Sequence, residues 1–219
     1  MKKKEVFQII LLAAGSSTRM KTDINKVFLQ LGQMPVLEHS LKKFLSWERC
    51  KKIILVTKEL PNWIKKLQVE HKYLVISKGG NERFHSFQAA LEHLDKETPY
   101  VLVHDAARPL FSIDLLEKVY KKISTDNVVI PYIKIEDTIR NMENPKEKVQ
   151  REKYIRVQTP QAFSNNWVKK LRKLTFHTSY TDEASCLIEL GAKLSLVEGE
   201  KSNQKITTME DFKYLSSML

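Results

Sequence analysis

Short apolar runs rich in β-branched residues alternate with longer amphipathic stretches along most of the chain. This pattern limits the folds open to it more than any other feature, because continuous apolar runs are typical of strands covered on both faces. When amphipathic helices separate such strands, the strands form a mostly parallel sheet between two layers of helices. We therefore predict an α/β protein with a three-layer, Rossmann-like fold.

The pattern assigns the elements as follows. Strands are predicted over residues 6–13, 53–57, 74–77, 100–104, 128–131 and 193–197. Helices are predicted over 36–45, 61–67, 83–94, 113–123, 165–174 and 181–190, with a last helix from Met209. No repeat or linker interrupts this series, and 219 residues with 42% hydrophobic content suffice for one core. Residues 1–219 are therefore expected to form a single domain.

Residues 134–156 break the alternation, because they are polar and charged around the turn signal Asn144-Pro145. Residues 135–140 and 148–151 could pair as the two sides of a hairpin around that turn. A surface loop is the simpler interpretation. A projecting hairpin arm would serve dimerisation, and on this basis we predict a homodimer.

The formal net charge of +11 indicates an anionic partner. Nucleic acid is one possibility, and a basic nucleic-acid-binding protein without catalysis is the alternative function from another class. The lysines count against it, because they form scattered pairs separated by acidic and apolar residues instead of one basic stripe. These pairs are Lys42-Lys43, Lys51-Lys52, Lys65-Lys66, Lys121-Lys122 and Lys169-Lys170. The surplus charge favours a phosphorylated substrate, and we expect no nucleic-acid partner.

The chain has two cysteines far apart in sequence, Cys50 and Cys186, and neither has a neighbour at metal-ligand spacing. This is typical of a reducing compartment without disulfides. The first apolar run is too short to span a membrane, and no signal-like cleavage site follows it. We expect a cytoplasmic protein with no membrane partner.

The first predicted strand ends in Ala13-Ala14-Gly15-Ser16-Ser17-Thr18-Arg19-Met20, and Lys26 follows six residues later. Ligands of open α/β sheets bind at the carboxyl ends of strands, where small residues let backbone N–H groups approach phosphates. Arg19 and Lys26 could neutralise the phosphate charge. The loop matches neither the dinucleotide fingerprint nor a P-loop. Taken alone it indicates phosphate binding, with an ordinary strand-to-helix turn as the alternative.

Asp105 follows the predicted strand 100–104 and lies three residues before Arg108. A carboxylate at a strand's carboxyl end can hold Mg²⁺ between phosphates, since this cation prefers oxygen ligands. Its other possible role is to cap the following turn. Its position beside an arginine favours the metal, so Mg²⁺ is the predicted cofactor.

Six motifs in a fixed order carry a family resemblance that covers essentially the whole chain. After the first loop come Gly79-Gly80-Asn81-Glu82-Arg83-Phe84-His85-Ser86 and Val103-His104-Asp105-Ala106-Ala107-Arg108-Pro109. Three more follow, namely Thr159-Pro160-Gln161-Ala162-Phe163, Thr181-Asp182-Glu183-Ala184 and Asn203-Gln204-Lys205-Ile206-Thr207. Together they resemble the sugar nucleotidyltransferases, and most closely the 2-C-methyl-D-erythritol 4-phosphate cytidylyltransferases. The ribitol 5-phosphate cytidylyltransferases share much of this set and are the nearest competitor.

The resemblance implies transfer of a cytidylyl group from CTP to a sugar-alcohol phosphate in non-mevalonate isoprenoid biosynthesis. It gives Arg19, Lys26 and Lys205 the role of stabilising the pentavalent phosphate. Arg108, Thr138 and Arg151 match positions that hold the acceptor or build its pocket. The positions implied for CTP are Ala13, Ala14, Gly15, Gly79, Gly80, Asn81, Ser86 and Ala106.

Three residues depart from the family's usual pattern. Ser17 replaces a second glycine in the first loop, Asn25 replaces a proline before Lys26, and Asn81 replaces an aspartate after the glycine pair. Asn25 frees a backbone that proline would restrict, and Asn81 keeps a hydrogen-bonding side chain without the charge. These departures leave a third possibility, a nucleotide sensor that binds CTP without turning it over.

Overall fold

The computed structural model describes residues 6–20, 24–175 and 180–219. Within them, one sheet of eight strands forms the centre of the molecule in the order β10-β7-β9-β6-β1-β4-β5, with β8 paired to β7. Its strands are β1 (Phe7–Leu12), β4 (Cys50–Thr57), β5 (Leu74–Lys78), β6 (Tyr100–Asp105), β7 (Asn127–Lys134), β8 (Ile155–Val157), β9 (Gln161–Ser164) and β10 (Lys193–Glu198). All six predicted strands are present, with ends that differ by a few residues.

The pairing is mostly parallel. β1 lies between β4 and β6 and runs parallel to both, and β5 and β10 run parallel to their neighbours. β9 is inserted antiparallel between β6 and β7, and β8 is antiparallel to the end of β7. The sequence pattern did not predict these two short strands. The order brings the carboxyl ends of β1 and β6 side by side, where Leu12 is in register with Asp105.

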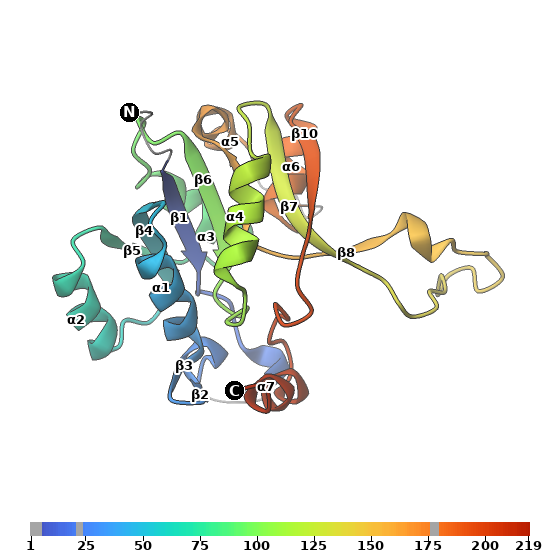
Figure 1. Ribbon diagram of the computed structural model, residues 1–219, viewed down its shortest axis with the longest axis horizontal. Helices are drawn as coiled ribbons and strands as arrows, with labels where there is room; N and C mark the ends of the chain where they lie inside the picture. The colour runs from blue at the N-terminus through green and yellow to red at the C-terminus, as the bar shows by residue number, and fades with distance from the viewer. Residues whose placement is uncertain (1–5, 21–23, 176–179) are drawn as a thin grey trace.

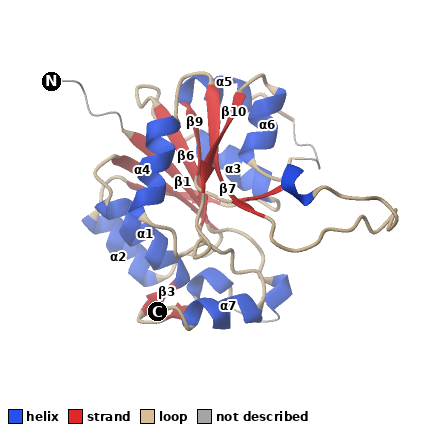
Figure 2. Ribbon diagram, turned by 45° about the vertical axis from the view of Figure 1, so that its right-hand side comes forward, coloured by secondary structure: helices blue, strands red, loops and turns tan. Residues whose placement is uncertain are grey.

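Helices cover both faces of the sheet, as Figure 2 shows. Alternate residues of β1 face opposite layers, with Ile9 and Leu11 in one core and Ile10 and Leu12 in the other. The first core also contains residues of α1 (Val36–Ser46), α2 (Asn62–Glu70) and α4 (Ile113–Lys122). The second contains residues of α3 (Arg83–Leu91), α5 (Val168–Leu171) and α6 (Glu183–Glu189). The predicted three-layer α/β fold is confirmed.

The helix predicted over residues 165–174 is shorter than expected. It begins as a 3₁₀ turn, η4 (Asn165–Trp167), and continues as α5 only to Leu171. The Ser164 side chain accepts a hydrogen bond from the Asn166 N–H and so starts the turn. Serine is a good N-cap because its oxygen satisfies a donor that the first turn leaves free.

The last helix, α7 (Met209–Ser216), starts where the sequence predicted. The Thr208 side chain accepts from the Asp211 N–H, and Asp211 accepts in return from the Thr208 N–H. This reciprocal capping box satisfies two free donors at once. The helix packs beside the short hairpin β2 (Gln30–Leu31) and β3 (Met34–Pro35), as seen near the C-terminus in Figure 1. A small third core joins them, made of Met20, Leu31, Val36, Ile206 and Leu215.

Residues between β7 and β8 form an arm that projects away from the sheet (Figure 1). The predicted projection is present, but the pairing predicted for 135–140 with 148–151 is wrong, because neither segment is a strand. The pairing instead lies at the base, where β7 and β8 are antiparallel over residues 132–134 and 155–157. Most arm side chains are exposed, and an isolated two-stranded ribbon without a buried face is marginally stable. The turn at Asn144-Pro145 is confirmed, since the Glu147 N–H donates to the Asn144 carbonyl over 3.0 Å.

A search of the described residues for a helix long and apolar enough to cross a membrane finds none.

Candidate active site

A cavity of about 320 Å³ opens where β1 and β6 end. It gathers nine of the predicted nucleotide and catalytic residues from the first loop, the second loop, the end of β6 and the segment before α7. They are Ala14, Gly15, Arg19, Lys26, Gly80, Asn81, Ser86, Asp105 and Lys205. Four basic side chains (Arg19, Lys26, Arg83, Lys205) and two acidic ones (Glu82, Asp105) line it. The surplus positive charge suits a polyphosphate.

Gly79 and Gly80 are required by close packing. A Cβ on Gly79 would lie 2.1 Å from the Ala14 Cβ, and one on Gly80 would lie 2.5 Å from the His85 Cβ. The second loop is therefore packed directly against the first. The Gly80 N–H also donates to the Ser86 hydroxyl over 3.1 Å, which ties the loop to the start of α3.

Ala13 and Ala106 lie behind the cavity instead of lining it. The Ala13 N–H donates to the Val56 carbonyl over 2.8 Å, and the Ala106 N–H donates to the Leu12 carbonyl over 2.9 Å. Both side chains are buried in the first core. These two alanines extend the strand pairing past the ends of β1 and β6, and so fix the loops that carry the polar residues.

Lys26 and Lys205 line the same cavity although they come from opposite ends of the chain. The segment of Lys205 folds back beside β6, where the Ile206 N–H donates to the Ala107 carbonyl over 2.8 Å. Lys26 is only 8% exposed. Burial, followed by the nearby charges of Lys205 and Arg19, lowers the pKa of Lys26 below its ordinary value. Such a cluster of buried positive charge is favourable when an anion occupies the cavity.

Asp105 is 7% exposed and holds two cations. Its Oδ1 accepts from the Arg83 Nε over 3.1 Å, and its Oδ2 accepts from the Lys205 Nζ over 2.7 Å. Burial alone would raise the pKa of this carboxyl, but Arg83 and Lys205 outweigh burial and hold the pKa far below the ordinary value. The carboxylate therefore stays ionised at every physiological pH.

Arg83 and Glu183 form a second ion pair that the sequence reasoning missed as site residues. The two terminal nitrogens of Arg83 donate to the two Glu183 oxygens over 2.6 and 2.9 Å. Glu183 is 1% exposed, and burial raises its pKa although Arg83 opposes the shift. The bidentate pair fixes the guanidinium that holds Asp105. Both residues stand in family motifs, but a single sequence does not show that they pair across 100 positions.

Asp105 suits the predicted Mg²⁺. Among the residues that the structure describes, no three His, Cys, Asp or Glu side chains gather as a dedicated metal site. Magnesium, however, is commonly held by one or two carboxylates together with substrate phosphates. Asp105 is ionised, lies at the cavity and could hold the cation in that way once a triphosphate is present, with Lys205 released from its Oδ2.

The buried His104 has a structural role beside this site. The Thr159 hydroxyl accepts from the Asp105 N–H over 3.1 Å and lies 3.1 Å from the His104 Nδ1. The other nitrogen, Nε2, donates to the Arg108 carbonyl over 3.0 Å, because a carbonyl can only accept. In a neutral ring Nδ1 then carries no hydrogen and accepts from the Thr159 hydroxyl. Burial lowers the pKa of His104 to about 3, which keeps the ring neutral as this chain of hydrogen bonds requires.

The later motifs are joined to one another at the cleft. The Gln161 side chain donates to Asp182 over 2.9 Å and accepts from the Ala184 N–H over 3.0 Å. Asn203 is fully buried and donates to the Thr159 carbonyl over 2.8 Å. These side chains hold the segments before α6 and α7 against β9, and in this way they set the position of Lys205.

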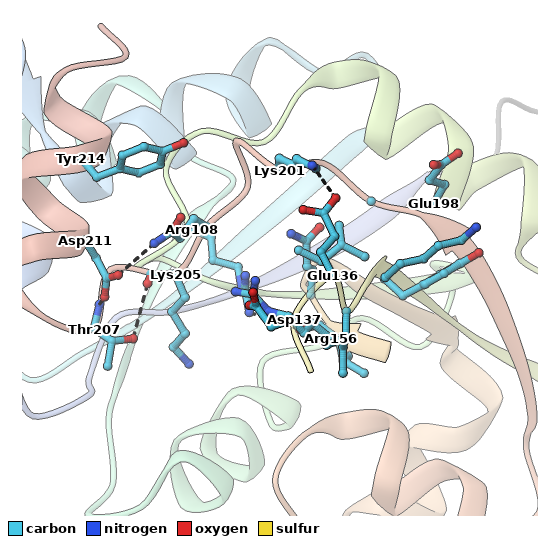
Figure 3. Close-up of a pocket in the computed structure, with 18 residues that line it drawn as sticks. Arg108, Glu136, Asp137, Arg156, Glu198, Lys201, Lys205, Thr207, Asp211 and Tyr214 are labelled. Carbon is cyan, nitrogen blue, oxygen red and sulfur yellow. Dashed lines mark hydrogen bonds and ion pairs between the residues drawn. The ribbon is translucent and has the colours of Figure 1, made fainter. Parts of the chain in front are cut away.

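Two further cavities continue the cleft on the side of the arm. One of about 200 Å³ is lined by Arg83, Asp105, Arg108, Thr181, Lys205 and their neighbours. The other, of about 570 Å³, lies between the base of the arm and α7, and Figure 3 shows its lining. Lys205 lines all three cavities. Arg108 lines the two cavities on the arm side, and it donates to the carbonyls of Asn203 and Val157.

Thr138 and Arg151 are not brought to the cleft in the single chain. Both are exposed on the arm, and neither lines any of the three cavities. Arg151 donates to the Glu136 carbonyl and to the Glu152 carboxylate, so both contacts stay within the arm. Their predicted role toward the acceptor remains a prediction.

Known proteins resemble the chain over nearly its full length. The family model for IspD, 2-C-methyl-D-erythritol 4-phosphate cytidylyltransferase, matches residues 7–219. The enzyme of that name from Bacteroides thetaiotaomicron is 35% identical over 216 residues, which cover 96% of this chain and 98% of the relative. The bifunctional enzyme IspD/IspF of Pelagibacter ubique is 36% identical, over 94% of this chain and 55% of that longer protein.

Solved structures give the same result. The 4-diphosphocytidyl-2C-methyl-D-erythritol synthase of Anaerococcus prevotii has a TM-score of 0.81 and 27% identity, covering 98% of this chain and 96% of that one. The bifunctional IspDF of Campylobacter jejuni has a TM-score of 0.80 and 33% identity, covering 96% of this chain and 54% of that one. The chain belongs to the 2-C-methyl-D-erythritol 4-phosphate cytidylyltransferase family.

Proposed function

We propose that the protein transfers the cytidylyl group of CTP to 2-C-methyl-D-erythritol 4-phosphate, forming CDP-methylerythritol and pyrophosphate. One observation supports placing this activity at the described cavity. Lys26 and Lys205, from opposite ends of the chain, line one cavity together with the ionised Asp105. That arrangement matches the charge that develops when a triphosphate is attacked at its α-phosphorus.

In the proposed reaction an oxygen of the acceptor's phosphate attacks the α-phosphorus in line. A new P–O bond forms, the bond between the α-phosphorus and the bridging oxygen breaks, and pyrophosphate leaves with the electron pair. The attacking oxygen is already anionic, so the step needs no general base. Lys26, Lys205 and Arg19 stabilise the negative charge on the phosphoryl oxygens, and the protein contributes mainly position and electrostatics.

Mg²⁺, held by Asp105 and the phosphates, would neutralise part of the triphosphate charge and orient it. Arg83 keeps the Asp105 carboxylate ionised and in place for this role, and Glu183 holds the Arg83 guanidinium. The Arg108 side chain, at the boundary between the two cavities on the arm side, is suited to the acceptor's phosphate.

Two features support a homodimer as part of the proposal. The arm projects from the sheet, and its Thr138 and Arg151 lie outside the cavities of their own chain. In a dimer the arm could bring these side chains to the neighbouring subunit's cleft. A monomer in sedimentation at micromolar concentration would contradict this part.

The direct test is pyrophosphate release from each of the four nucleoside triphosphates, with methylerythritol 4-phosphate or ribitol 5-phosphate as acceptor. We expect turnover with CTP and methylerythritol 4-phosphate in the presence of Mg²⁺. Turnover only with ribitol 5-phosphate would replace the acceptor, and release from UTP or ATP but not CTP would reject the base. Tight duplex DNA binding at physiological salt without CTP turnover would favour a nucleic-acid-binding protein instead. CTP binding without turnover of any acceptor would favour a sensor.

A further inference from the structure

Ser17 and Asn25, two of the residues that depart from the family pattern, contact each other across the first loop. The Ser17 hydroxyl donates to the Asn25 Oδ1 over 3.1 Å and accepts from the Lys26 N–H over 2.7 Å. The Asn25 Nδ2 donates to the Gly15 carbonyl over 3.2 Å. Hydrogen bonds of the Ser17 and Asn25 side chains therefore link the start of the first loop to the backbone at Lys26.

These bonds fix the backbone that carries Lys26. Asn25 also caps the 3₁₀ turn η2 (Lys26–Phe28), because its Oδ1 accepts from the Val27 N–H over 3.3 Å. Two successive backbone N–H groups, those of Lys26 and Val27, are therefore held by the Ser17–Asn25 pair. The direction in which the buried Lys26 side chain leaves the backbone depends on both.

The same pair also controls the Gly15 carbonyl. In a trans peptide the carbonyl of one residue and the N–H of the next point in opposite directions. Asn25 holds the Gly15 carbonyl, so the Ser16 N–H of the same peptide points away from Asn25. Gly15 and Ser16 both line the 320 Å³ cavity. A carbonyl turned into that cavity would repel phosphate oxygens, whereas an N–H attracts them.

We propose that Ser17 and Asn25 act as one clasp that positions Lys26 and the Gly15–Ser16 peptide for the triphosphate. Neither residue is catalytic, because each acts through a neighbour. The clasp rests on the proposed function, since it orients groups for phosphoryl transfer. It also explains why two departures in one loop are compatible with activity: the Ser17 hydroxyl and the Asn25 amide supply by hydrogen bonding the restraint that proline would give through its ring.

If the two side chains act as one clasp, the effects of substituting Ser17 and Asn25 on kcat should be strongly non-additive. Removing Ser17 takes away the acceptor of the Lys26 N–H, and removing Asn25 takes away the group that orients that acceptor, so the second substitution has little left to remove. Contacting residues are coupled in this way, whereas independent sites add. Misplacement of a reacting group by about 1 Å can cost up to about 10² in rate.

The test is a double-mutant cycle in the full-length protein, with kcat and the KM for CTP measured by pyrophosphate release. We expect Ser17→Ala and Asn25→Ala each to lower kcat about 10-fold, with less change in KM. The double variant should lose about 10-fold as well, and not about 100-fold. Ser17→Thr keeps the hydroxyl and should retain kcat. Asn25→Asp keeps the acceptor but replaces the donor to the Gly15 carbonyl by a charged oxygen that repels this carbonyl, so it should lose at least as much as Asn25→Ala.

The matched control is Ser124→Ala, which removes a hydroxyl that donates to Asp126 in an exposed turn at the opposite edge of the sheet. It should leave kcat unchanged. Losses that multiply in the double variant, full activity of Asn25→Asp, or unchanged kcat in both alanine variants would each overturn the clasp. Failure of the unaltered protein to turn over CTP would instead reject the proposed function, so the two failures are distinguishable.

Discussion

The nucleotide cleft and the arm are built by opposite means. In the cleft the central carboxylate is buried and held by partners from distant parts of the chain, as Asp105 is held by Arg83 and Lys205. In the arm the contacts are exposed, and those of Arg151 are made with other arm residues. The cleft is therefore organised before a ligand arrives. The arm, in contrast, exposes side chains that are suited to contact another subunit.

The largest expected effect is a loss of stability when the ion pairs of Arg83 in the cleft are removed. Arg83→Met would leave Glu183 without its partner and Asp105 with only Lys205, and removal of one member of a buried ion pair costs about 3–5 kcal/mol. We expect a correspondingly lower free energy of unfolding in urea. The control is Lys201→Met, which breaks the exposed pair between the segment after β10 and Glu136 of the arm and should not change stability. Equal effects of the two variants would contradict the contrast between the regions.

The next effect concerns rate instead of stability. Lys26→Ala and Lys205→Ala should each lower kcat by about 10²–10³, or roughly 3–4 kcal/mol, because each loses a cation that stabilises developing charge. The KM for CTP should change much less, as expected for contacts that strengthen in the transition state. Steady-state kinetics measures both. Near-normal kcat in both variants would mean that the described cavity is not the active site.

Acid pH should lower the free energy of unfolding because of the buried His104. Its pKa is lowered by burial from 6.5 to about 3, so the unfolded chain takes up a proton at a pH where the folded protein does not. The stability contributed by the neutral ring is fully present above pH 6.5 and is lost as pH falls from there toward 3. Urea unfolding at several pH values measures the slope. His104→Asn should make stability less dependent on pH in this window, whereas an unchanged slope would contradict the assignment.

The smallest expected effect tests whether Arg151 of the arm serves the cleft of its own subunit or that of a neighbouring subunit. Arg151→Ala should raise the KM for the acceptor about 10-fold and leave thermal stability unchanged, because the side chain is exposed. A mixture of Arg151→Ala and Lys26→Ala subunits separates the two arrangements. If Arg151 serves the neighbouring cleft, mixed dimers contain one intact site and regain activity. If it serves its own cleft, every site that retains Lys26 keeps the raised KM for the acceptor.

The same contrast explains what the sequence could predict. The strands and helices that carry the cleft follow from local periodicity, which is why β1, β6 and the start of α7 were placed to within a few residues. Their sheet order also brings Lys26 and Lys205 together, as the family resemblance implied. The motif contains Arg83 but does not reveal its role, because its two partners lie 22 and 100 positions away and no periodic signal connects them.

The arm was harder to predict for a physical reason. The turn signal at Asn144-Pro145 suggested two paired sides, but pairing needs a face to bury and residues 135–150 are mostly exposed, as in the simpler interpretation of a surface loop. The strand β9 was missed for the opposite reason. At four residues it is too short for a periodic signal, and only its place between β6 and β7 gives it partners.

The position of Lys205 after the last strand has a consequence for how the enzyme is made. All strands of the central sheet, from β1 to β10, and the loop of Lys26 precede it in the chain, so a growing polypeptide has synthesised most of the cleft before this cation exists. Domains generally begin to fold from the N-terminal side during synthesis. A product truncated after β10 would keep Lys26, Asp105 and Arg83 but would leave Asp105 without its second cation. With the role proposed for Lys205, catalytic competence arrives last, and we expect chains that end after β10 to lack turnover even where they retain the sheet.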